Sequence, residues 1–189
     1  MPRLFTAIEV PVSIAQQLAL LQCGLPGARW IERENLHITL RFIGDIENPM
    51  ANELIHALER VKSASLSLKL ENLDVFGGSK PHSLFASVKR NSALLDLQGE
   101  QERICQSIGL EPEGRKYKPH VTIARIRGAK TNDIAKYLSG NGVFQTPSFS
   151  VDRFVLLSSR SSVGGGPYGE EVSYQLTKKE MNHGGNAVA

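Results

Sequence analysis

Hydrophobic residues along this chain recur at two periods, which predict strands and helices in turn. Alternating runs rich in aliphatic and β-branched residues predict strands at residues 3–10, 36–43, 66–70, 83–88, 120–126, 149–157 and 172–177. Helical spacing predicts helices at about residues 13–23, 49–61, 94–108 and 131–138. Because strands and helices mix without a strict βαβα alternation, the pattern favours an α+β fold over a doubly wound parallel sheet.

Local signals indicate where the first three helices begin and end. Ser13 and Gln16 match a capping box at the start of the first helix, and Gly24 is expected to end it. Pro49 suits the first turn of the second helix, because its missing amide proton is not needed there. Gly109 is expected to close the third helix.

Glycine and proline identify two loops, and the end of the chain lacks any period. The stretch "FGGSKPH" from Phe76 and the stretch "GGGP" from Gly164 are predicted loops, the second of them flexible. From Met181 the sequence "MNHGGNAVA" shows no periodicity. We therefore expect a single domain over residues 1–178 and a disordered C-terminal tail over residues 179–189.

Composition narrows the class of protein without identifying a function. The 189 residues carry a formal net charge of +3, which permits a phosphate-bearing ligand but falls short of the dense basic stripe of a duplex binder. Cys23 and Cys105 have no partner in a disulfide or zinc-ligand spacing. No signal peptide, membrane-spanning run or P-loop is evident, so we expect a soluble, cytoplasmic protein without nucleoside triphosphate chemistry.

Two stretches of the chain read almost alike: "NLHITLRFIG" from Asn35 and "KPHVTIARIRG" from Lys118. Side chains alternate along a strand, so each stretch presents a histidine and a threonine on one face and two aliphatic residues on the other. The two pairs are His37 with Thr39 and His120 with Thr122. A single such histidine is more often a half-buried structural residue, but finding the pattern twice among five histidines points to a function.

Two imidazoles can act as base and acid at once near neutral pH, and threonine hydroxyls can donate hydrogen bonds to anionic oxygens. Two pairs that face each other across a groove would therefore suit a phosphate, with no metal or other cofactor required. His56, His82 and His183 lie in a helix, a Gly-rich loop and the tail, and we assign them no catalytic role.

At these residues the chain resembles the 2H phosphoesterase superfamily, and more closely its RNA 2′,3′-cyclic phosphodiesterase family, also called 2′-5′ RNA ligase-like. The marks of the resemblance are "RLFTAIEV", the twin motifs, the "VFGG" loop and the closing "LLSS" followed by a late tyrosine. The resemblance implies two lobes related by a pseudo-twofold axis, each an antiparallel sheet backed by helices, around a central groove. It also implies metal-independent hydrolysis of RNA 2′,3′-cyclic phosphate ends to 2′-phosphates, and in some members the joining of 2′-5′ linkages.

Carried onto this chain, the resemblance makes His37 the proton donor and His120 the proton acceptor, with Thr39 and Thr122 as phosphate contacts. It further suggests Phe42 and Arg125, each five positions after its histidine, as substrate-binding residues. Strand alternation alone would place both on the opposite face unless a bulge or a strand end intervenes. Phe42 as a core residue and Arg125 as a structural cation therefore stay open at this point.

The partner expected from these residues is an RNA end or oligonucleotide that carries a 2′,3′-cyclic phosphate, bound by a monomer without a membrane or a metal. Two alternatives stay open: a module that binds RNA ends or nucleotides without useful catalysis, and a cyclic phosphodiesterase that acts on a small nucleotide. Arg41, Arg125 and Arg127 lie near the motifs and fit the binding module. Substrate choice is expected to lie in the loops at residues 76–82 and 159–168.

Overall fold

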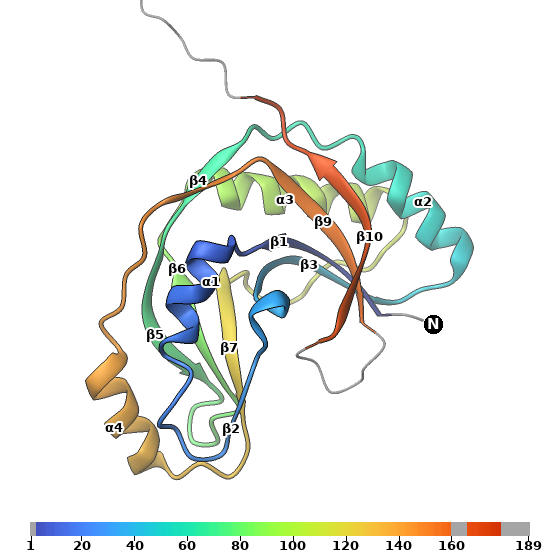
Figure 1. Ribbon diagram of the computed structural model, residues 1–189. Coiled ribbons are helices and arrows are strands. Elements are labelled where there is room, and N and C mark those ends of the chain that lie inside the picture. The colour runs from blue at the N-terminus through green and yellow to red at the C-terminus, as the bar shows by residue number, and fades with distance from the viewer. Residues whose placement is uncertain (1–2, 160–165, 179–189) are drawn as a thin grey trace, which may run out of the picture.

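An antiparallel sheet runs through the molecule, seen in the computed structural model, which describes residues 3–159 and 166–178 (Figure 1). Within these residues the sheet has eight strands in the order β10-β9-β1-β3-β7-β6-β5, and β2 pairs with β7 on the side away from β6. The strands of this sheet are β1 Arg3–Glu9, β2 Ala28–Trp30, β3 His37–Asp45, β5 Leu70–Phe76, β6 Ser83–Val88, β7 His120–Ile126, β9 Arg153–Ser159 and β10 Tyr168–Gln175. A separate two-stranded sheet pairs β4, Leu66–Leu68, with β8, Phe149–Val151.

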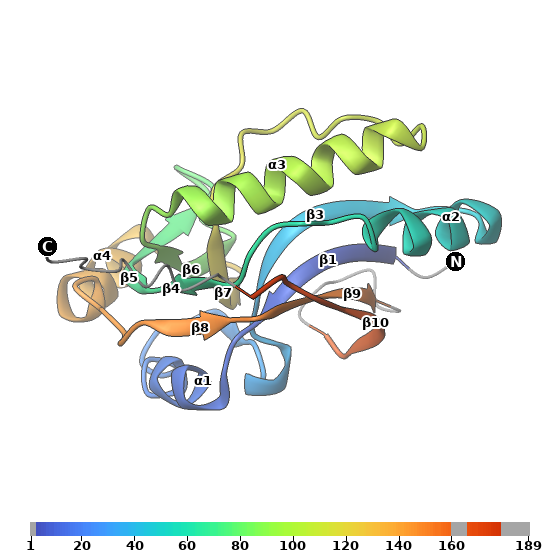
Figure 2. The same cartoon turned by 90° about the horizontal axis from the view of Figure 1, so that it is seen from above.

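Four α-helices accompany the sheet in the described residues: α1 Val12–Ala19, α2 Asn48–Leu58, α3 Ser92–Ser107 and α4 Thr131–Asn141. A short 3₁₀ helix, η1, covers Arg33–Asn35 and leads into β3. Seen from above, α3 runs along one side of β1 and β3, and α1 lies on the other side of the molecule (Figure 2). The apolar face of α3 is fully buried at Leu94 and Leu97, which join a core shared with the central strands. The α+β fold that the hydrophobic pattern predicts is thus confirmed, and the strands pair antiparallel, as the resemblance implies.

The centre of the sheet is the place where β3 and β7 meet. Their ladder consists of a single pair, Ile38 with Val121. On one side of this pair the sheet continues through β1, β9 and β10, and on the other through β6 and β5, with β2 alongside β7. Where two separate lobe sheets are expected from the resemblance, the described residues form two halves of one continuous sheet.

Several predicted element boundaries are wrong, for identifiable reasons. Ser13 does not cap α1: Pro11 is the N-cap residue, its carbonyl accepts from the amides of Ile14 and Ala15, and no side chain caps the helix. The helix ends at Ala19 rather than before Gly24, and turns and bends occupy the intervening residues. Pro49 and Gly109 do lie at the start of α2 and just after α3, as predicted.

Two runs that alternate as single strands are divided in the structure. Residues 66–70 belong to β4 and the start of β5, and residues 149–157 belong to β8 and β9, which are separated at Asp152. The last strand begins at Tyr168 and ends at Gln175, so it is shifted from the predicted 172–177. β2 was not predicted at all, since three residues are too short to show a period.

Some expectations fall outside the described residues. The tail at 179–189, His183, and Gly164 and Gly165 of the predicted flexible loop all lie there. Among the helices that are described, none is long and apolar enough to cross a membrane.

Candidate active site

The two central strands bring the twin motifs together. Ile38 and Val121, which pair across β3 and β7, are both fully buried. Because neighbours along a strand face opposite ways, the residues on either side of this pair point away from that core. These four residues line one cavity: His37, Thr39, His120 and Thr122. Since the strands are antiparallel, the two histidines lie on opposite sides of the central pair, about 7 Å apart along the strand direction.

Both histidines are held in the same way. The Nδ1 atom of His37 lies 2.8 Å from the carbonyl oxygen of Asn35, and the Nδ1 atom of His120 lies 2.6 Å from that of Lys118. A carbonyl oxygen only accepts, so each Nδ1 carries the proton and donates it. Each ring therefore keeps its Nε2 atom for chemistry in the groove.

His37 is enclosed by two aromatic rings. The centre of the Phe5 ring lies 5.1 Å from that of His37, and the ring of Tyr168 meets it edge-on at 5.0 Å. Burial lowers the pKa of His37 from 6.5 to about 4; the Asn35 carbonyl opposes this shift, and the charges of His120 and Arg125 add to it. A neutral ring is thus the resting form of His37 at neutral pH.

His120 has a matching aromatic surround from the other half of the sheet. The rings of Phe76 and Phe85 stack on each other and meet the imidazole edge-on, with ring centres 4.8 and 5.2 Å away. The ammonium of Lys118 lies over both phenyl rings, 5.0 and 4.7 Å from their centres. Burial lowers the pKa of His120, the Lys118 carbonyl raises it, and the charges of Lys118 and Arg125 lower it further.

A bulge in β3 turns Phe42 towards the groove. In the ladder with β1, Thr39 pairs with Ala7 while Arg41 pairs with Thr6, which leaves Leu40 as the extra residue. Leu40 and Arg41 are consequently both buried although they are neighbours, and the alternation is reversed beyond them. Phe42 is 39% exposed and lines the cavity together with His37 and Thr39. Strand alternation alone would place Phe42 in the core, and that interpretation is wrong.

β7 has a similar bulge, three residues after its own histidine. In the ladder with β6, Thr122 pairs with Phe85 while Ala124 pairs with Leu84, so Ile123 is the extra residue. Ile123 and Ala124 are both fully buried, and Arg125 returns to the side of the groove, where it lines the cavity. The charge of Arg125 lowers the pKa of both histidines.

The groove consists of two connected parts of about 960 and 560 Å³. The larger part extends along β2 and the end of β7, and the smaller part extends towards residues 113–118. Six residues line both parts and mark the junction: His37, Thr39, Phe42, His82, Arg125 and Tyr168. The substrate-sized space is therefore continuous across the two motifs.

His82 and Tyr168 are groove residues to which the motif pattern assigned no role. His82 follows the turn at Gly77, where a φ of +113° and a Cβ that would lie 2.2 Å from the Lys80 carbonyl oxygen both require glycine. The amide of His82 then donates to the Phe76 carbonyl at 2.9 Å. The "FGGSKPH" stretch contains the signal for this turn, but the groove that it faces is a tertiary feature.

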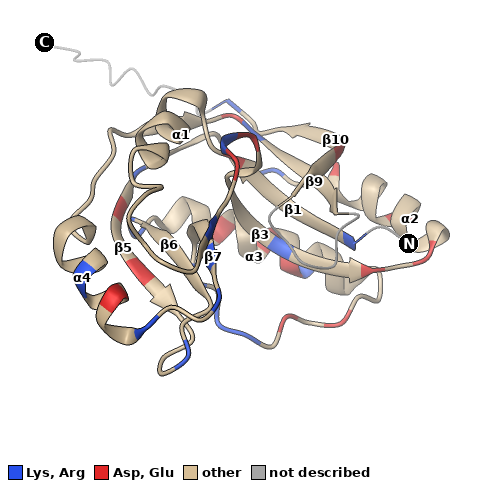
Figure 3. Cartoon of the chain, turned by 60° about the horizontal axis from the view of Figure 1, so that its bottom comes forward, with Lys and Arg blue, Asp and Glu red and all other residues tan. Residues whose placement is uncertain are grey.

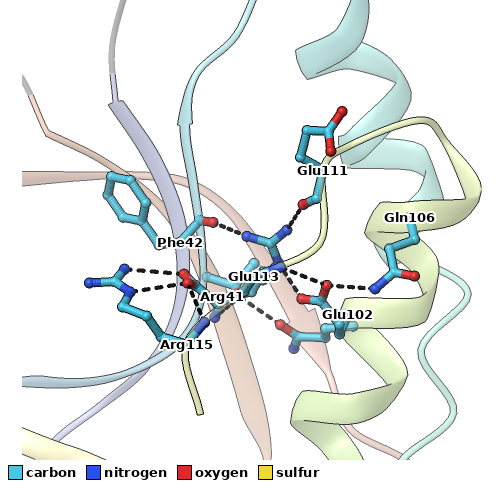
Figure 4. A network of polar contacts seen from close by, with 9 residues as sticks. Arg41, Phe42, Glu102, Gln106, Glu111, Glu113 and Arg115 are labelled. Atoms are coloured by element: carbon cyan, nitrogen blue, oxygen red, sulfur yellow. Dashed lines mark hydrogen bonds and ion pairs between the residues drawn. The ribbon is translucent and has the colours of Figure 1, made fainter. Parts of the chain in front are cut away.

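Arg41 lies between the motif and the core and does not serve as a free cation for the groove. Its side chain is 6% exposed, and its Nε atom lies 2.5 Å from Glu102 of α3. Its guanidinium also donates to the carbonyls of Phe42 and Glu111, while the Phe42 ring points away from this network (Figure 4). Arg41 therefore gives no support to the binding-module alternative.

The same network holds the segment that borders the smaller part of the groove. Glu102 accepts hydrogen bonds from Gln106 Nε2 at 2.7 Å and from the Glu113 amide at 3.1 Å (Figure 4). Further along, the hydroxyl of Tyr117 donates to the Thr39 carbonyl at 3.1 Å. The α3–β7 connection is thus fastened to α3 at Glu113 and to β3 at Tyr117. Within the described residues, no group of three or more His, Cys, Asp or Glu side chains gathers as a metal ligand set.

Comparison with known proteins agrees with this geometry. A family model described as LigT-like phosphoesterase matches residues 8–85 and residues 87–168, and each segment holds one His-Thr motif. The RNA 2′,3′-cyclic phosphodiesterase of Aeropyrum pernix is 35% identical over 114 residues, a match that covers 59% of this chain and 64% of the relative. The match to this relative thus spans less than two thirds of its length.

A second relative is matched over more of its length. The RNA 2′,3′-cyclic phosphodiesterase of Aquifex aeolicus is 32% identical over 142 residues, which cover 72% of this chain and 76% of the relative. Among solved structures, E. coli LigT complexed with 3′-AMP superposes with a TM-score of 0.76 at 22% identity, over 94% of this chain and all of that one. The fold, the duplicated motif segments and the sequence identity together show that the chain belongs to the LigT-like phosphoesterase family.

Proposed function

We propose that this chain hydrolyses the 2′,3′-cyclic phosphate ends of RNA to 2′-phosphates, without a metal ion. The observation that carries the proposal is the convergence of two His-Thr pairs on one groove, with the Nε2 atom of each imidazole left for chemistry. Relatives named RNA 2′,3′-cyclic phosphodiesterase support the substrate class. We further propose that residues 1–178 act as one domain, with a pseudo-twofold axis near the Ile38–Val121 pair.

The reaction needs an in-line attack, in which water approaches the phosphorus opposite the leaving 3′-oxygen. In the proposed order, neutral His120 takes a proton from the water as its oxygen bonds to phosphorus. The P–O3′ bond breaks, and protonated His37 gives its proton to the 3′-oxygen, which leaves the phosphate on the 2′-oxygen. The hydroxyls of Thr39 and Thr122 donate to the non-bridging oxygens.

The lowered pKa values of the two histidines mean that the substrate must supply a negative charge that helps His37 to hold a proton. His120, whose pKa is lowered by burial, is ready to act as a base at neutral pH. His37, with a pKa of about 4, holds a proton only when an anion beside it raises that pKa. A cyclic phosphate carries one negative charge and would lie between the two rings, so its binding favours the protonated acid that the step requires.

The test is hydrolysis of a short oligoribonucleotide with a 2′,3′-cyclic phosphate end in the presence of EDTA, with the product identified by mass against 2′- and 3′-phosphate standards. We expect a 2′-phosphate product, and His37→Ala and His120→Ala should each lower the rate by a factor of roughly 10² or more. His56→Ala is the matched control, because His56 is an exposed residue of α2 that lines neither part of the groove. Binding of the oligonucleotide without any product would instead favour the RNA-end binding module.

A further inference from the structure

The larger part of the groove is rich in arginine. Four arginines line it, and no aspartate or glutamate does so among the described residues: Arg3, Arg29, Arg125 and Arg127. Figure 3 shows basic residues in blue on β7, while the acidic residues in red lie on β5 at the outer edge of the same half of the sheet. We call the part of the groove along Arg29, Arg125 and Arg127 the arginine arm.

The backbone holds the arginines of the arm side by side. Arg29 of β2 pairs directly with Arg125 of β7, and Arg127 follows just after the end of β7 and also lines this part of the groove. The turn before β2 is tight, since the Arg127 amide donates to the Gly27 carbonyl at 2.9 Å and a Cβ on Gly27 would meet the Arg127 carbonyl at 2.5 Å. Like charges directly opposite one another on paired strands are destabilising. A bound anion would add a negative charge beside the two paired guanidinium groups.

Arg125 connects the arm to the proposed catalytic pair. Its guanidinium forms no ion pair with a described carboxylate, and its Nε atom is buried without a hydrogen-bond partner. Burying such a donor unpaired is costly unless a ligand satisfies it. Arg3, on the far side of the groove, shares its charge with Asp45 at 3.5 Å, so we leave it out of the arm.

The smaller part of the groove is less suited to a chain of phosphates. Glu113 lines it, and Arg115 is engaged by both carboxylate oxygens of Glu113, at 3.0 and 3.2 Å. Lys118 lies 3.9 Å from Asp74 and over two aromatic rings. Arg115 and Lys118 on this side thus already have a counterion or ring contacts, whereas no aspartate or glutamate among the described residues lines the larger part.

We propose that the arginine arm binds the phosphodiester backbone on the 5′ side of the terminal cyclic phosphate. The inference rests on the proposed function, and it makes the enzyme select an oligonucleotide over a mononucleotide. Each phosphate that reaches the arm gains a charge-assisted hydrogen bond from arginine, which raises kcat/KM roughly tenfold. A mononucleotide cyclic phosphate reaches the catalytic pair but leaves the arm without a phosphate.

The experiment compares three substrates that carry one, two and three phosphates: adenosine 2′,3′-cyclic phosphate, its 5′-phosphorylated form, and a triadenylate with a 2′,3′-cyclic end. We expect kcat/KM to rise along this series. The plot of log(kcat/KM) against log[salt] should become steeper by up to about 0.7 for each added phosphate, because each contact releases counterions. For the triadenylate, with two more phosphates than the mononucleotide, the slope should thus be about 1.4 more negative.

A double variant tests the arm itself. Arg29→Gln with Arg127→Gln should remove most of the advantage of the triadenylate over the mononucleotide and most of the extra salt slope. The matched control is Arg90→Gln with Arg103→Gln, which changes net charge equally at two exposed positions that line neither part of the groove. This control should keep both the advantage and the slope.

Three outcomes separate the possibilities. Equal kcat/KM and equal salt slopes for the three substrates would overturn the arm while leaving the proposed hydrolysis intact, and so would equal losses in the two double variants. If no substrate is opened, the proposed function fails. In that case, the anisotropy of a fluorescent triadenylate with a 2′-phosphate end decides the arm: binding lost only in the Arg29→Gln, Arg127→Gln variant supports it, and binding unaffected by that variant refutes it.

Discussion

Protonation of His37 should couple the stability of the fold to pH over a defined range. The folded protein holds the pKa of His37 at about 4, compared with 6.5 for an ordinary histidine, because the ring is buried between Phe5 and Tyr168. Between these two values the unfolded chain binds a proton that the folded chain refuses, so the free energy of unfolding rises with pH in this window. Each pKa unit corresponds to about 1.4 kcal/mol. The contribution of His37 is thus fully present above about pH 6.5, and about 3 kcal/mol is lost as the pH falls to 4.

Urea unfolding of the wild type and of His37→Gln at several pH values from 7.5 to 4 measures this contribution. Trp30 is the single tryptophan, and its ring centre lies 6.3 Å from that of Tyr137, so its fluorescence should report the transition. From pH 7.5 to 4 the wild type should lose about 3 kcal/mol more than His37→Gln. All other titratable groups are present in both proteins, so the difference between the two curves reports His37 and its coupling to His120. His56→Gln, at an exposed position of α2, should follow the wild type.

Parallel stability curves for the wild type and His37→Gln would refute the reasoning. They would mean that His37 takes up its proton in the folded state as easily as in the unfolded chain. The groove would then solvate the imidazolium, and burial could not be the cause of a resting neutral ring.

Three further predictions concern the groove and its supports. Glu102→Gln should lower the free energy of unfolding by roughly 3 kcal/mol, measured by urea titration, because it leaves the buried Arg41 without its counterion. A change below about 1 kcal/mol would show that the hydrogen bonds from Arg41 to backbone carbonyls are enough to stabilise its buried charge. Phe42→Ala should change stability little, since the residue is 39% exposed. It should raise KM for an oligonucleotide roughly tenfold, because it removes a surface on which a base can stack. Phe42→Tyr keeps an aromatic face and should retain the wild-type KM, and an unchanged KM in Phe42→Ala would contradict a role of Phe42 in binding. The pH profile of kcat should be bell-shaped with limbs that belong to the coupled pair of His37 and His120, whereas a rate that rises steadily to alkaline pH would contradict the two-histidine mechanism.

The parts of the site that could be predicted from sequence are those that local geometry determines. Alternation along a strand is enough to place His37 with Thr39, and His120 with Thr122, on common faces, and the buried Ile38 and Val121 follow from the same rule. That the two faces belong to one groove depends on the pairing of β3 with β7, which no local signal specifies. The duplication of the motif is the one feature of the sequence that indicates it.

Features that escaped prediction depend on contacts between distant segments. The buried pair of Arg41 and Glu102 joins a strand to a helix, and its members look like ordinary charged residues in the sequence. Tyr168 reaches His37 only because β10 pairs with β9, which in turn pairs with β1. The capping box at Ser13 failed for the opposite reason: a local motif was present, but the helix begins at Val12, with Pro11 as its N-cap residue. A local sequence motif can thus be present without forming its usual structure, because contacts elsewhere in the fold favour another conformation.

The two bulges show how much of the site lies outside its motifs. Each bulge reverses the alternation three residues after a histidine, and without that reversal neither Phe42 nor Arg125 would face the groove. A bulge leaves backbone groups out of the ladder, and these groups need other partners when they are buried. In β3 the amide of Arg41 donates to the Thr6 hydroxyl at 3.1 Å, and in β7 the carbonyl of Ile123 accepts from the Ile31 amide at 3.0 Å.

Side chains from two helices or their ends complete these arrangements. The Thr6 hydroxyl donates in turn to Gln101 of α3 at 2.6 Å, and Gln22, just after α1, donates to the Ile123 carbonyl at 3.2 Å. Neither glutamine contacts the groove, yet each fastens a bulge that orients a residue lining it. A chain could therefore keep both His-Thr motifs and still lose its substrate contacts if these supports were replaced. For this reason the twin motifs identify the chemistry of such a groove more securely than they identify what the groove can hold.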